Sequence, residues 1–124
     1  MNMSRLGAVL VAVALFGATA GPAVAQCGAK TGDLAPQAVE IYQQTKAQAL
    51  SADQRAQFEL AKLYRDGKGV EPDLVRAYAW LNVAARRITD ASKERDTLAK
   101  CLKSGQELEA QLLSVKLLQS VSSR

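Results

Sequence analysis

Residues 56–85 constrain the fold most, because two runs of helical periodicity are joined there by a short glycine-bearing turn. Gly67 and Gly69 readily adopt the positive φ values that end a helix and reverse the chain. Apolar residues on either side of the turn recur every three or four positions, as on one face of a helix. They are Ala56, Leu60, Leu63 and Tyr64 before the turn, and Leu74, Ala77, Tyr78, Leu81, Ala84, Ala85 and Ile88 after it. The stretch therefore predicts a helical hairpin.

Many of these positions belong to a larger set with a characteristic spacing. The set is Ala56, Leu60, Tyr64, Gly67, Gly69, Val70, Asp73, Ala77, Trp80, Ala84 and Ala85. It closely resembles the Sel-one-like repeat, a helix–turn–helix unit related to the tetratricopeptide repeat, and the match covers about residues 52–88. The resemblance implies a tetratricopeptide-like antiparallel hairpin and, as its function, protein–protein interaction.

Only one unmistakable repeat is present, whereas repeat arrays generally need about three units for a continuous core. Residues 34–49 predict at best a degenerate helix in the preceding position. The stretch 94–111 resembles the terminal helices that close such proteins in bacteria. We therefore expect an all-α fold, with one hairpin flanked by an N-terminal helix and two C-terminal closing helices.

Start signals divide the rest of the chain into helices. Asp33 precedes a start that carries Pro36 in its first turn, where proline costs no hydrogen bond. Residues 51–54 and 104–107 each have the pattern of a capping box, in which Ser and Gln or Glu satisfy first-turn amides. Thr89 marks a further start. No segment alternates as a strand does, so the pattern predicts helices throughout.

These signals place one helical domain at residues 34–119. The polar, glycine-bearing residues 26–33 predict an N-terminal arm, and residues 120–124 a frayed tail. Asp73 is expected to cap the second helix of the hairpin. The two closing helices have apolar faces, made by Leu98, Cys101 and Leu102 in the first and by Leu108, Leu112 and Val115, flanked by Leu113, Leu117 and Val121, in the second.

The N-terminus has the organisation of a secretory signal peptide. Arg5 precedes an apolar run at residues 6–20, which is broken at Pro22 and followed by small residues up to Ala25. The run is short for a membrane span, which needs about 20 apolar residues. We expect cleavage after Ala25 to remove residues 1–25 and release a secreted or periplasmic protein without a membrane span. An uncleaved anchor is the alternative.

Two cysteines, Cys27 and Cys101, lie near opposite ends of the expected mature chain. In an exported protein an even pair of cysteines favours a disulfide. A bridge here would close a loop of more than seventy residues, worth roughly 4 kcal/mol in the chain-entropy model. The alternative is two free thiols, with Cys101 a small core residue.

The residue types argue against catalysis. The chain has no histidine, which removes the commonest general base, the usual triads and most zinc sites. The two cysteines have no metal-ligand or redox spacing. Asp66 with Glu71 or Asp73 would make an acid/base pair around the turn, but capping and solubility account better for these carboxylates. We expect no enzymatic activity, cofactor or metal.

Charge and aromatic residues limit the partners. The net charge is +4, and the basic residues are scattered among acidic ones, so no phosphate-binding stripe is evident and nucleic acid is not expected. The adjacent Arg86 and Arg87 are either a docking point for an acidic partner or a solvated helix end. Tyr78 is either a binding aromatic or a core residue, whereas Trp80 favours the core.

These observations favour an exported protein–protein interaction module or adaptor. One alternative is an inhibitor or accessory factor of an envelope enzyme, which also acts by binding. A carboxylate-dependent enzyme is the least favoured alternative.

Overall fold

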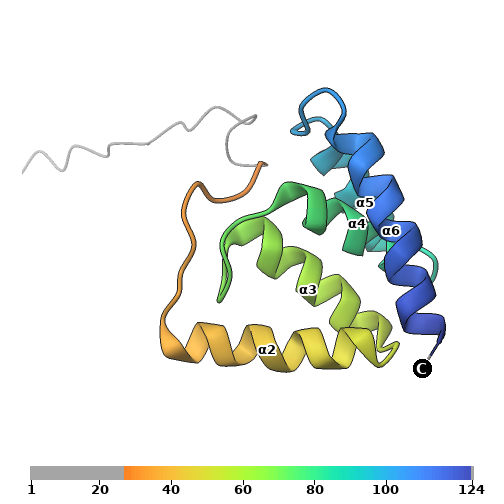
Figure 1. Cartoon of the computed structure of the whole chain (residues 1–124). Helices are drawn as coiled ribbons and strands as arrows, with labels where there is room; N and C mark the ends of the chain where they lie inside the picture. Colours follow the sequence, from red (N-terminus) through yellow and green to blue (C-terminus); the bar gives the residue numbers. More distant parts are fainter. Residues whose placement is uncertain (1–26, 124) are drawn as a thin grey trace, which may run out of the picture.

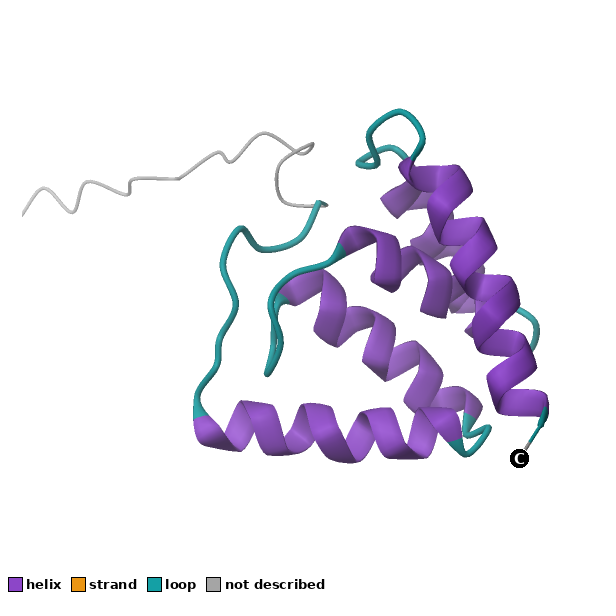
Figure 2. Cartoon of the chain, in the orientation of Figure 1, coloured by secondary structure: helices purple, strands orange, loops and turns teal. Residues whose placement is uncertain are grey.

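The computed structural model describes residues 27–123, and this part of the chain contains five helices and no strand. Figure 1 shows α2 (Pro36–Leu50), α3 (Gln54–Asp66), α4 (Leu74–Ala84), α5 (Thr89–Ala99) and α6 (Gln106–Ser122). Loops join the helices and the arm precedes them (Figure 2). The expected all-α class is confirmed. The expected signal peptide, residues 1–25, lies outside the described residues.

Helix α4 lies at the centre of the packing. It contacts α3 on one side and α5 and α6 on others, while α2 packs against α3 (Figure 1). Three leucines from three successive helices, Leu60, Leu81 and Leu98, are the largest fully buried side chains. Trp80 is also buried, as its spacing predicts. The core therefore extends from the hairpin into the first closing helix.

The turn between α3 and α4 forms as the sequence predicts. Gly67 ends α3 with a left-handed φ of 64°, and its amide donates to the Leu63 carbonyl oxygen. Asp73 caps α4, because its side chain accepts a hydrogen bond from the Arg76 amide at 2.9 Å. The Asp73 amide in turn donates to the Tyr64 carbonyl oxygen at 2.9 Å, which holds the start of α4 against the end of α3.

Both predicted capping boxes are wrong. Ser51 ends α2 instead of starting α3, since its amide and hydroxyl both donate to the Ala47 carbonyl oxygen. Asp53 is the N-cap of α3 and accepts from the Ala56 amide at 2.9 Å. Gly105, with a φ of 85°, is the N-cap of α6 and makes no side-chain cap bond. Both helices therefore begin one or two residues later than the boxes predict, and only α3 has a side-chain cap.

The predicted frayed tail, residues 120–124, overlaps the last turn of helix α6. Helix α6 continues through Ser122, past the expected end of the domain at residue 119. Val121 packs against the core, and this burial holds the last turn in place.

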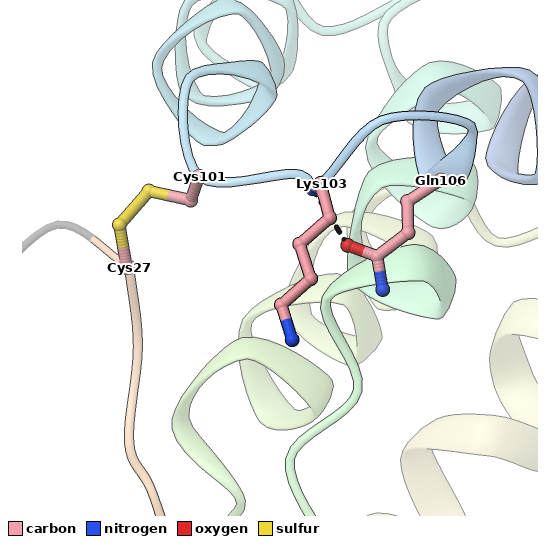
Figure 3. The surroundings of a disulfide bond; sticks show 4 residues. All are labelled: Cys27, Cys101, Lys103 and Gln106. Atoms are coloured by element: carbon pink, nitrogen blue, oxygen red, sulfur yellow. Dashed lines mark hydrogen bonds between the residues drawn. A yellow bond between two sulfur atoms is a disulfide. The ribbon is translucent and has the colours of Figure 1, made fainter.

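At the other end of α6, the Lys103 amide donates to the Gln106 side-chain oxygen at 2.8 Å (Figure 3).

The N-terminal arm lies along the hairpin turn. The Asp33 amide donates to the Gly67 carbonyl oxygen at 2.6 Å, and the Gly69 amide donates to the Asp33 carbonyl oxygen at 2.7 Å. Gly28 lies so close to the Arg65 carbonyl that a side chain at this position would clash with it. The arm therefore depends on a glycine and on the backbone of the turn.

A disulfide joins Cys27 in the arm to Cys101 between α5 and α6 (Figure 3). The predicted bridge is therefore confirmed. It joins two residues that are 74 positions apart in the sequence. Among residues 27–123, no helix has the length and hydrophobicity that a bilayer span requires.

Replacing Cys27 by serine should destabilise the oxidised protein, because the bridge restricts a long loop in the unfolded chain. The expected loss is about 4 kcal/mol, or roughly 15–30 °C in Tm. Calorimetry measures it, with the wild type in reductant as the control. Reduced wild type and reduced Cys27→Ser should melt together, and equal melting of the oxidised forms would contradict the stabilising role of the bridge.

Tyr64 and Tyr42 link α3 to α2 through their hydroxyl groups, which lie 2.8 Å apart in a buried hydrogen bond. Their rings meet edge to face, with centroids 5.6 Å apart. Burial, followed by the hydrogen bond with Tyr42, raises the pKa of Tyr64 well above its usual value. The folded protein thus disfavours the Tyr64 phenolate.

Stability should therefore fall as the pH rises above the ordinary tyrosine pKa. Between about pH 10 and the raised pKa, only the unfolded chain loses this proton, so ionisation favours unfolding. We expect the wild type to lose more unfolding free energy than Tyr64→Phe between about pH 8 and about pH 11. Urea titrations at the two pH values measure the difference, and equal losses in the two proteins would contradict it.

Candidate protein-binding surface

Helix α6 exposes a row of large apolar side chains. Leu108, Leu112 and Val115 have exposed fractions of 62%, 58% and 53%. Their spacing of four and three residues places them on one face, and we call them the α6 outer row. The sequence predicts this row as the apolar face of the closing helix, but the structure points it toward solvent.

The opposite face of α6 packs on the domain through small residues. Ala110 and Ser114 are buried, and Leu117 packs partly against the core. Small side chains at the contact allow two helices to approach closely, and larger leucines would hold them apart. This explains why α6 turns its bulkier row outward.

Polar contacts also fix the rotation of α6 about its axis. The Asn82 amide of α4 donates to the Ser114 hydroxyl at 3.1 Å, and Arg95 of α5 donates to the Asn82 side-chain oxygen at 3.0 Å. The Ser114 hydroxyl donates to the Gln111 carbonyl oxygen at 2.7 Å. This chain of hydrogen bonds couples three helices, so rotating the outer row inward would break it.

A groove of about 580 Å³ runs beside the outer row, between α6 and the start of α4. Leu112 belongs both to the row and to the groove wall, so the two surfaces are continuous. The other apolar walls are Val75 and Leu113, and charged walls include Arg76, Glu109 and Lys116. An apolar strip with a charged margin is the usual make-up of a protein-docking surface.

Tyr78 does not belong to an exposed surface. Only 6% of it is accessible, and its hydroxyl lies 3.4 Å from a Glu107 carboxylate oxygen on α6. Burial raises the pKa of Tyr78. The structure therefore supports the interpretation of Tyr78 as a core residue. Its side chain links α4 to α6.

Arg86 and Arg87 are exposed at the end of α4, as expected for either interpretation. They border a smaller hollow of about 160 Å³, whose apolar walls include Val83, Leu118 and Val121. This hollow lies near the C-terminal end of α6, whereas the larger groove lies near its start. The arginines therefore lie outside the surface formed by the outer row and the groove.

The carboxylates near the turn have structural partners. Asp66 accepts from the Arg65 guanidinium at 2.8 and 3.0 Å, and Arg65 also donates to Glu94 at 2.7 Å. Asp73 is engaged as the cap of α4, while Glu71 is exposed. Residues 27–123 contain no cluster of His, Cys, Asp or Glu that could hold a metal ion.

Comparison with protein-family models, with curated proteins and with solved structures found no match for this chain.

The outer row was not recognisable as exposed from the sequence. Leucine and valine occur on more than one side of α6, so periodicity alone does not tell which side is buried. The useful signal is Ala110 and Ser114, since small residues at helical spacing indicate a close helix–helix contact. Their position opposite Leu112 points to the correct orientation.

The exposure of Leu112 can be tested by the same truncation at two leucines. Leu98→Ala removes a fully buried side chain and should cost about 2–5 kcal/mol. Leu112→Ala removes an exposed one and should change the unfolding free energy by less than about 0.5 kcal/mol. Urea denaturation at low protein concentration measures both. A large loss for Leu112→Ala would mean that the row is buried in the domain.

Proposed function

We propose that this protein is an exported protein–protein interaction module whose docking surface is the α6 outer row with the adjacent groove. The observation that carries the proposal is the alignment of Leu108, Leu112 and Val115 on a solvent-facing helix. Exposed apolar residues in one contiguous strip are costly in water and are typical of surfaces that bind protein.

Export is supported by two independent features. The N-terminal sequence has the organisation of a signal peptide ending at Ala25. The Cys27–Cys101 disulfide is compatible with an oxidising compartment, such as the periplasm or the exterior of the cell. We therefore propose that the mature protein works outside the cytoplasm.

The resemblance of residues 52–88 to a Sel-one-like repeat agrees with a binding role. We propose that α3 and α4 are a single tetratricopeptide-like hairpin and that α5 and α6 close it. In this view the binding surface is on the outside of a closing helix, since a single hairpin does not build the long concave groove of a repeat array. The protein would then act as a compact adaptor.

Site-specific photocrosslinking in the source cells tests the proposal. A photoreactive residue at position 112 should give crosslinked protein products in the exported fraction, because the outer row contacts the partner. The same residue at the exposed position Gln43 of α2 is the matched control and should not give them. Adding Leu108→Glu should reduce the products at position 112.

A crosslinking pattern that is the same at positions 112 and 43, or the absence of any product at 112, would contradict the proposed surface. Purified Leu108→Glu protein must melt like the wild type, so that loss of products reports on binding.

A further inference from the structure

Two opposite charges lie beside the α6 outer row, on one flank of the helix. Glu109 and Lys116 are seven residues, or about two turns, apart, so they lie on the same flank of the helix. Both are exposed, and both line the groove next to Leu112. Within residues 27–123 neither takes part in an ion pair. One helix thus presents an acidic and a basic group on one side of an unpartnered apolar row.

We infer that the partner of the outer row is a second copy of this chain, with the two α6 helices packed antiparallel about a two-fold axis. This inference rests on the proposed docking surface. In this arrangement Leu112 packs against Val115 of the second copy, and Leu108 lies near its Gln119. Because the axis is two-fold, each contact occurs twice.

Charge selects the antiparallel direction. In a parallel pair the two-fold axis would place this flank of the two copies on opposite sides of the seam, so Glu109 and Lys116 would find no partner across it. In the antiparallel pair, Glu109 of each copy lies beside Lys116 of the other. Two ion pairs then form at the margin of the apolar row, where docking removes part of the surrounding water. The charges on this flank therefore pair only when the two helices run antiparallel.

The spacing along α6 fits such a pairing. Leu108, Leu112, Val115 and Gln119 follow the four–three–four spacing of residues that form the seam between two packed helices. Ala110, Ser114 and Leu117 fall on the other side, where α6 packs on its own domain. One face of α6 thus packs against its own domain, and the opposite face is exposed and can pack against a second copy.

The dimer should be weak, because a single pair of helices buries less surface than a standard stable interface. We expect it to assemble reversibly at protein concentrations on the order of 100 µM, as small interfaces of transient complexes do. A dilute preparation should contain mainly monomer.

Analytical ultracentrifugation of the purified mature protein tests the inference with charge-reversed variants. Glu109→Lys and Lys116→Glu, each alone, replace both ion pairs by like-charge contacts and should weaken dimerisation about tenfold. The first variant is basic at both positions of the flank, and the second is acidic at both. In an equal mixture, opposite charges therefore face each other again, so mixed dimers should form about as well as those of the wild type.

Glu40→Lys is the matched control, because it makes the same charge change at an exposed site on α2. It should dimerise like the wild type. Leu112→Glu should remove the dimer altogether while the melting temperature of the dilute monomer stays unchanged. Wild type that stays monomeric up to about 1 mM, well above the range of transient interfaces, would overturn the inference. Failure of the mixture to recover dimers would overturn the antiparallel pairing.

The outcomes also separate this inference from the proposed docking function. Crosslinks from position 112 to a different protein, together with a monomeric wild type, would leave the docking surface standing and remove the second copy as its occupant. Crosslinks from position 112 only to another copy of the chain, with concentration-dependent dimers, would support the second copy. No crosslinks and no dimer would remove both.

Discussion

The burial of α4 on all sides is the constraint on which the rest of the structure depends. Ala77 to Leu81 are all buried without interruption, so every face of this helix must be covered. A helix that is apolar all around is stable in water only when several neighbours enclose it. Helix α3 alone covers one side, and α5 and α6 must supply the others. Helices α5 and α6 are therefore part of the minimal folding unit, and this explains how a chain with one helical hairpin forms a core.

This requirement also decides how α6 is used. To cover α4 closely, α6 presents the small residues Ala110 and Ser114, and the hydrogen bond between Asn82 and Ser114 sets its orientation. Because that face of α6 packs against α4, the bulky Leu108 and Leu112 lie on the opposite face and are exposed to solvent. Their exposure follows from the geometry of the helix contact. Because an exposed strip of this kind is unfavourable in water, its presence favours a partner that covers it.

The sequence predicts most of the fold because the strongest signals are local. The positive-φ glycine at position 67, the Asp73 cap and the periodic apolar residues of α3 and α4 each depend on near neighbours in the chain. The capping boxes at Ser51 and Ser104 were wrong, because a motif of four residues does not tell which nearby residue ends the previous helix. The orientation of α6 and the burial of Tyr78 depend on contacts about thirty residues away, with Asn82 and Glu107. Such long-range contacts are not encoded in a periodic pattern.

The disulfide links the arm to the surface that we propose for binding. Cys27 belongs to an arm whose backbone is bonded to the hairpin turn at Gly67 and Gly69, and Cys101 lies just before α6. The bridge thus connects the turn between α3 and α4 with the loop that leads into α6. Since the groove is formed by the start of α4 and the first half of α6, its two walls are tied at the same end of the molecule. A groove with fixed walls loses less conformational entropy when a partner binds, so the bridge is consistent with the docking that we propose as well as with folding.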